Sequence, residues 1–266
     1  MGERLAGRTA LIVGAGQTPG TTMGNGRAMA VTFAREGARL VLVDRSAEQL
    51  EHTLELVRAE GAEAVQVIAD IASDDGPANV VAAANDAFGS FDILINNVGI
   101  GFGDDVPHRL TDDGYDRIMD VNLRATWRTC REAMPTLRAT GKASIVSISS
   151  VAAVAFSPGL TAYGLSKAGV NALTSSIALT NAKYGVRANA IMPGLVDTPM
   201  GVDAVAAARG MAREDLAASR AAMVPMRRQG TAWDIANAAL FLSSDEAGWI
   251  TGVVLPVDGG QSAKIG

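Results

Sequence analysis

The chain has 266 residues, of which 48% are hydrophobic and 19% are charged, and its formal net charge is -5. This composition is typical of a folded chain with a large buried core and argues against disorder. The acidic balance gives no electrostatic footprint for nucleic acid or for an anionic membrane surface, so we expect neither partner and favour a small-molecule substrate.

Cysteine and histidine are too sparse for a disulfide framework or a metal site. Cys130 is the one cysteine, and His52 and His108 lie far apart in the sequence. The first residues contain no apolar signal core, which does not support secretion, and we expect a cytoplasmic protein. The uncharged stretch from residue 143 to 166 is rich in serine and contains Pro158, so we interpret it as a buried strand and a loop instead of a membrane span.

Short apolar runs recur along the chain and predict seven β-strands, at Thr9–Val13, Leu40–Val43, Ala64–Ile68, Ile93–Ile95, Ser144–Ile148, Arg187–Ile191 and Val253–Val257. The runs do not alternate polar with apolar residues, which is expected of parallel strands covered by helices on both faces. The segments between them have helical spacing, with start signals at Ser46 and Thr231. We predict one α/β domain over residues 1–266, with a Rossmann-type doubly wound parallel sheet and residues 199–230 as a substrate-side insertion.

A glycine-rich segment, residues 14–26, follows the first strand and precedes a helical run. Glycines let the chain turn sharply and let backbone N–H groups approach a pyrophosphate at a helix N-terminus. We predict that Gly14, Gly24, Asn25 and Gly26 contact a dinucleotide. No glycine set here completes G-x-G-x-x-G, so a glycine-rich turn without a ligand is the alternative.

The second strand ends at Asp44, about 20 residues beyond the glycines, where a carboxylate would accept hydrogen bonds from the adenosine ribose. This favours NAD over NADP, because a 2′-phosphate would meet a negative charge. Arg45 follows directly and would suit that phosphate, so NADP stays open. The alternative for Asp44 is an exposed residue that opens a turn.

Tyr163 and Lys167 are four residues apart in a helical segment and therefore share one face. A cation close to a phenol favours the phenolate and brings it nearer to the pH at which it exchanges a proton, as alcohol oxidation requires. A pair at this spacing arises by chance in roughly 5% of chains of this composition, so the pair alone is only suggestive.

Further motifs, in chain order, resemble those of the short-chain dehydrogenase/reductase family over nearly the whole chain. Asn97, in Asn96-Asn97-Val98-Gly99, and Asn122 resemble two conserved asparagines of the family. Ser150 stands thirteen residues before Tyr163, at the position of the family's serine, whereas Ser149 does not. The segments that resemble cofactor contacts are Asp70-Ile71 beside adenine and, after Pro193-Gly194, Val196 and Thr198 beside the nicotinamide carboxamide. Asp258-Gly259-Gly260 resembles the C-terminal signature of the family.

The resemblance implies a role for each residue of the centre. Ser150 would bind the substrate oxygen, and Tyr163 would take its proton while hydride leaves. Lys167 would depress the phenol pKa and bind the ribose, and Asn122 would hold a water that links Lys167 to solvent. It also implies a homo-oligomer, a dimer or a tetramer, in which the helix that begins near Tyr163 pairs across subunits.

The glycine segment departs from the family pattern, because Gly14 and Gly24 are ten residues apart instead of four. About six extra residues must bulge near the adenosine phosphates. We predict that Gly24 opens the helix, and that the extra threonines either donate to phosphate or lie in solvent; they are Thr18, Thr21 and Thr22.

Together these features predict an NAD(P)-dependent oxidoreductase that acts on a secondary alcohol or ketone. The segments expected to line its pocket are mostly apolar and favour a hydrophobic or cyclic substrate, although such side chains also pack cores; they include Phe102, Val154, Phe156, Leu195, Met200, Met223 and Met226. One alternative is a 3-oxoacyl thioester reductase, which Gly141 and Tyr184 disfavour because such reductases tend to carry arginine there. The other is a non-catalytic dinucleotide-binding sensor of the same fold.

Overall fold

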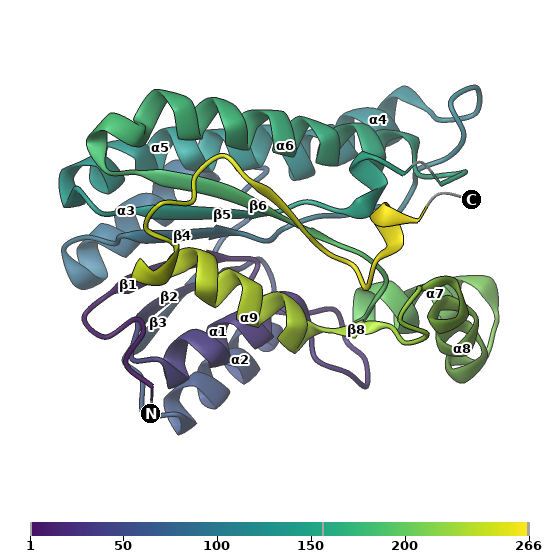
Figure 1. Cartoon of the computed structure of the whole chain (residues 1–266), viewed down its shortest axis with the longest axis horizontal. Helices are drawn as coiled ribbons and strands as arrows, with labels where there is room; N and C mark the ends of the chain where they lie inside the picture. The colour runs from purple at the N-terminus through teal and green to yellow at the C-terminus, as the bar shows by residue number, and fades with distance from the viewer. Residues whose placement is uncertain (1, 156, 265–266) are drawn as a thin grey trace.

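The computed structural model describes residues 2–155 and 157–264 (Figure 1). Seven parallel strands form the central sheet in the order β3-β2-β1-β4-β5-β6-β9. They are β1 (Thr9–Val13), β2 (Arg39–Asp44), β3 (Ala64–Ile68), β4 (Ile93–Asn96), β5 (Ser144–Ile148), β6 (Arg187–Pro193) and β9 (Val254–Val257). The chain changes direction across the sheet between β1 and β4, so the carboxyl ends of these two strands flank the crevice where such sheets bind ligands. The predicted doubly wound sheet is confirmed.

Helices cover both faces of the sheet (Figure 1). One face carries α1 (Asn25–Arg35), α2 (Ala47–Ala59) and α9 (Ala232–Ser243), which pack over Leu40, Ile93 and Val146. The other carries α3 (Gly76–Phe88), α5 (Ala125–Thr140) and α6 (Thr161–Asn181), over Leu11 and Ile145. Helix α4 (Asp112–Met119) leads into α5. Burial of the strands on both faces explains why their sequences do not alternate.

The predicted start signals of two helices are present. The Ser46 hydroxyl accepts a hydrogen bond from the backbone N–H of Gln49 at the start of α2. Thr231 and Asp234 form a reciprocal capping box at the start of α9, in which each side chain accepts from the other residue's backbone N–H. Single turns of 3-10 helix occur at Ala182–Tyr184, Asp245–Ala247 and Gln261–Ala263.

Beyond the carboxyl end of β6, the chain leaves the sheet. Two short parallel strands, β7 (Val196–Asp197) and β8 (Gly230–Thr231), bracket a π-helical turn η4 (Pro199–Asp203) and helices α7 (Ala204–Arg209) and α8 (Arg213–Met223). Figure 1 shows α7 and α8 beside β8, to one side of the central sheet. No helix in the described part of the chain is long and apolar enough to cross a membrane.

Candidate active site

Ser150, Tyr163 and Lys167 come together at the carboxyl end of β5. Ser150 follows β5 directly and caps a 3-10 turn, η2 (Val151–Ala153), where its hydroxyl accepts from the N–H of Ala152. Tyr163 and Lys167 lie one turn apart in α6, and the Lys167 ammonium is 5.7 Å from the centre of the Tyr163 ring. The neighbouring Ser149 is turned away, since its hydroxyl donates to the backbone oxygen of Lys167.

Burial sets the proton affinities of this group. It raises the pKa of the Tyr163 phenol, and interaction with the Ser150 hydroxyl offsets this in part. Lys167 is only 3% exposed, and burial lowers its pKa to about 8. Its ammonium donates to the backbone oxygen of Ile148 at 2.8 Å. From the sequence we expect Lys167 to depress the phenol pKa, but in this structure burial raises that pKa and the opposing effect comes from Ser150.

Asn122 lies in a π-helical segment, η1 (Asp120–Arg124), between α4 and α5. Its amide oxygen accepts from the N–H of Ile100 at 2.8 Å, and its amide nitrogen donates to the Ile100 carbonyl at 2.9 Å and to Ser166 Oγ at 3.0 Å. Ser166 in turn donates to the backbone oxygen of Tyr163 at 2.7 Å. Asn122 therefore ties the segment after β4 to helix α6.

Asp104 caps the first turn of α6, a role that we did not predict from the sequence. Its carboxylate accepts hydrogen bonds from the backbone N–H of Ala162 at 3.1 Å and of Tyr163 at 2.8 Å. These are first-turn amides of α6, which Leu160, the residue before the helix, has no side-chain oxygen to satisfy. No local signal points to this cap, because Asp104 lies 58 and 59 residues away from the amides that it binds.

The glycine segment approaches β4 closely. Gly14 has a φ of +87°, and a Cβ on Gly26 would lie 1.8 Å from the carbonyl oxygen of Gly14. The side-chain amide of Asn97 donates to that same oxygen at 2.8 Å. Helix α1 begins at Asn25 with Gly24 as its N-cap, as predicted. Only glycine fits at position 26, because the backbone there is in direct contact with the backbone of Gly14.

Asp44 lies at the end of β2, beside this loop. Its two carboxylate oxygens accept from the N–H groups of Gly16 and Ser46, each at 3.0 Å, and both retain lone pairs for further donors. Arg45 is exposed next to it. After β3, Asp70 is exposed, whereas the side chain of Ile71 is buried in the core.

The predicted nicotinamide-side residues lie where the chain leaves the sheet. Val196 pairs with Gly230 in the small sheet, and the Thr198 hydroxyl accepts from the N–H of Gly201 at 3.1 Å. Gln261, which the sequence argument did not single out, accepts from the N–H of Leu195 at 2.7 Å. The C-terminal segment thus fixes the start of this stretch.

A dinucleotide fits the residues at the amino end of α1. The side-chain oxygen of Asn25 is buried and has no hydrogen-bond partner among the described residues. Asn25 lies in the first turn of α1, where the helix dipole favours negative charge, so this end of the helix suits a phosphate.

The extra residues between Gly14 and Gly24 reach the segment on the substrate side of the sheet. Thr21 donates to Asp203 at the end of η4, and Thr22 contacts Asp197 of β7. The hydroxyls of Thr21 and Thr22 are therefore directed at the substrate-side segment, a contact that the sequence did not predict. Thr18 and Thr21 are exposed, as the solvent alternative expects, and contact with phosphate stays a prediction.

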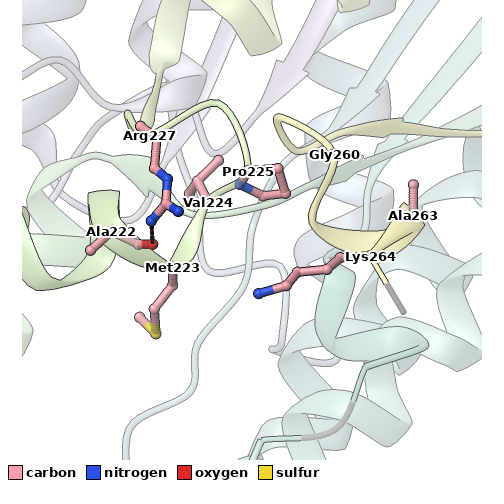
Figure 2. A pocket seen from close by; sticks show the side chains of 8 residues that line it. All are labelled: Ala222, Met223, Val224, Pro225, Arg227, Gly260, Ala263 and Lys264. Carbon is pink, nitrogen blue, oxygen red and sulfur yellow. Dashed lines mark hydrogen bonds between the residues drawn. The ribbon is translucent and has the colours of Figure 1, made fainter. Parts of the chain in front are cut away.

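Several apolar side chains that the sequence assigns to the pocket are exposed and do not pack in the core: Phe102 (80% exposed), Val154, Met200, Met223 and Met226. Phe156 lies outside the described residues. A cavity of about 520 Å³ lies between the end of α8 and the C-terminal segment. Figure 2 shows Met223 and Pro225 lining it together with Arg227 and Lys264. Ser150 and Tyr163 are not among its lining residues, so it lies outside the Ser150 group.

The glycine loop after β1, the carboxylate that ends β2 and the group of Ser150, Tyr163 and Lys167 all lie at the carboxyl ends of the parallel strands, where doubly wound sheets bind their ligands. A family model described as enoyl-(acyl carrier protein) reductase matches residues 20–262. The chain belongs to the short-chain dehydrogenase/reductase family of oxidoreductases.

Named relatives carry dehydrogenase activities. The chain is 36% identical to 2-(R)-hydroxypropyl-CoM dehydrogenase of Xanthobacter autotrophicus, over 92% of this chain and 96% of the relative. It is 35% identical to 2,5-dichloro-2,5-cyclohexadiene-1,4-diol dehydrogenase of Sphingobium indicum, over the full length of both. The crystal structure of carveol dehydrogenase from Mycobacterium avium in complex with NAD matches with a TM-score of 0.89 and 29% identity, over 98% of this chain and all of that one.

Proposed function

We propose that the protein is an NAD-dependent alcohol dehydrogenase that interconverts an apolar or cyclic secondary alcohol and its ketone. The observation that carries the proposal is the placement of Ser150, Tyr163 and Lys167 at the carboxyl end of the sheet. The glycine loop follows the carboxyl end of β1 in the same sheet, and the exposed Phe102 and Val154 follow β4 and β5.

The proposed chemistry divides between the cofactor and the chain. A nicotinamide supplies the acceptor for the hydride that leaves the alcohol carbon. Ser150 donates a hydrogen bond to the substrate oxygen, and Tyr163 takes the hydroxyl proton as the carbonyl forms. Lys167 holds a positive charge beside the phenol, and Asn122 positions the water through which Lys167 exchanges protons. The reverse direction returns the proton from Tyr163 to the alkoxide oxygen.

Residues at both ends of the crevice are proposed to hold the cofactor. Gly14, Gly24, Asn25 and Gly26 would take the pyrophosphate, and the nicotinamide would contact the segment that contains Val196 and Thr198. The adenosine end would be held by Asp44, Asp70, Ile71 and Asn97. NAD is favoured because the Asp44 carboxylate would repel a 2′-phosphate, although the exposed Arg45 would suit one. That carveol dehydrogenase was crystallised with NAD supports this choice.

An apolar or cyclic substrate is supported by the exposed methionines and by Phe102. One relative is named for its action on a cyclic diol, which agrees with this choice. The description of the matching family model favours a second candidate, an acyl thioester as substrate. A non-catalytic sensor is the third.

A spectrophotometric screen tests these candidates directly. NAD and NADP are combined with secondary alcohols, cyclic ketones and 3-oxoacyl thioesters, using the wild type and Tyr163→Phe. We expect NAD-linked turnover of cyclic alcohols that the substitution abolishes. Turnover confined to thioesters would favour the second candidate, and NAD binding without turnover of any substrate would favour the sensor.

We further propose a homo-oligomer, a dimer or a tetramer, that works in the cytoplasm. Helices α5 and α6 expose large apolar side chains that a subunit contact would cover; they are Trp127, Leu165 and Leu179. Sedimentation of a monomer at the concentration used in the assay would contradict the oligomer.

A further inference from the structure

The loop inserted between Gly14 and Gly24, here residues 15–23 and called the inserted loop, is docked against the segment that follows β7. Asp203 Oδ1 accepts hydrogen bonds from both the backbone N–H and the hydroxyl of Thr21, each at 3.1 Å. A Cβ on Gly20 would lie 2.7 Å from Pro199 Cβ and 2.9 Å from the Asp203 carboxyl carbon. Two elements about 180 residues apart in the sequence are thus in van der Waals contact here.

A cluster of charges connects this contact to helix α8. Arg213 donates to Asp197 at 2.5 Å, and its Nε lies 3.4 Å from Asp203 Oδ1. The Asp203 side chain is 16% exposed and the Arg213 side chain 22% exposed. The hydrogen bonds from Thr21 and the charge of Arg213 keep the pKa of Asp203 below its usual value, against the effect of desolvation. The carboxylate therefore stays ionised over the physiological pH range.

The inserted loop on one side of this charge cluster, and Asp197 on the other, each adjoin residues that we propose as cofactor contacts. At one end, the inserted loop leads into Gly24, whose N–H donates to Gln17 of the loop at 2.8 Å and which caps α1. At the other end, Asp197 lies between Val196 and Thr198, the proposed nicotinamide-side residues. A shift of α8 that breaks the cluster would therefore move the chain at the proposed pyrophosphate contact and at the proposed nicotinamide contact.

We propose that Thr21 and Asp203 are positioning residues, through which the inserted loop holds residues 199–223, the lid, in register with the cofactor site. This inference rests on the proposed function. The lid is also joined to β7, because Arg213 donates to Asp197 and Arg220 donates to the backbone oxygen of Val196. Its own apolar cluster is small and consists of three buried side chains, Val202, Ala206 and Leu216, with two partly buried neighbours. The polar contacts with the inserted loop add a second anchor on the cofactor side, and through it cofactor binding and lid position are coupled.

Limited trypsin digestion of the cofactor-free protein tests the attachment without an activity assay. The lid contains trypsin cleavage sites after Arg209, Arg213 and Arg220, and mass spectrometry identifies each cut. Asp203→Ala removes the acceptor for both Thr21 donors, and we expect about tenfold faster cleavage at these sites, since local opening governs proteolysis. Asp203→Asn keeps the acceptor oxygen and should restore most of the protection. Thr18→Val, at an exposed threonine of the same loop, is the matched control.

Two results would overturn the inference. If Asp203→Ala is cleaved in the lid no faster than Thr18→Val, while both unfold at the wild-type temperature, the inserted loop does not hold the lid. If calorimetry shows wild-type NAD affinity for Asp203→Ala, where we expect about tenfold weaker binding, the coupling to the cofactor is absent. A protein without oxidoreductase turnover would refute the proposed function, yet faster lid cleavage in Asp203→Ala would still support the attachment.

Discussion

Lys167 is expected to reduce the stability of the cofactor-free protein, and Lys167→Met should raise it. Burial lowers the pKa of this lysine from 10.5 to about 8, which corresponds to about 3 kcal/mol against the charged form at neutral pH. The substitution leaves the Ile148 carbonyl without its donor, at a cost of about 1 kcal/mol. The net gain is about 2 kcal/mol, or about 5 °C in Tm, although the same change should abolish turnover.

The stability of the wild type should also depend on pH through Lys167. Between pH 8 and 10.5 the unfolded chain keeps the Lys167 proton while the folded chain has lost it, so wild-type stability should rise with pH over this window. Lys167→Met should lack this rise. Chemical denaturation of the cofactor-free protein at a series of pH values measures both effects, with the exposed Lys142→Met as the control. A variant less stable than the wild type at pH 7, with the rise retained, would refute the reasoning.

Three further predictions concern the proposed site. Because burial raises the pKa of Tyr163, kcat for alcohol oxidation should still be rising with pH at about 10, the ordinary phenol value, and a plateau below that pH would contradict this. Tyr163→Phe should lower kcat by about 10³-fold at unchanged NAD affinity. Asp104→Ala removes the cap of α6, which is worth about 1 kcal/mol, and should lower kcat about fivefold with little change in the KM for NAD. The control is Asp105→Ala, which should leave kcat unchanged because the Asp105 carboxylate binds the N–H of Val106 instead. Asp44→Ala should weaken NAD binding about tenfold and narrow the preference for NAD over NADP, as measured by calorimetry; equal losses for both cofactors would argue against ribose recognition.

The parts of the fold that local patterns determine could be predicted from the sequence. Strands and helix starts follow from runs of apolar residues and from capping residues such as Thr231, whose partner lies three residues away. The cap on α6 could not be predicted, because Asp104 resembles any loop aspartate until the fold brings it to the amides of Ala162 and Tyr163. The same holds for the docking of Thr21 on Asp203, which depends on how two distant loops meet.

The pKa of Lys167 could not be predicted for a related reason. Its position in the sequence indicates a neighbour for Tyr163, but the depth of burial, which decides the sign of the shift, is a property of the assembled core.

The contacts that hold the two sides of the proposed site differ in kind, and so should the effects of breaking them. Helix α6 is held by its backbone, through Asp104 at its first turn and through Ser149 at the carbonyl of Lys167. The lid is attached through side chains of partly exposed charges at Asp203 and Arg213. Salt screens exposed charges more than it weakens backbone hydrogen bonds. Raising the salt concentration should therefore increase the KM for NAD, through the lid, before it lowers kcat, through α6.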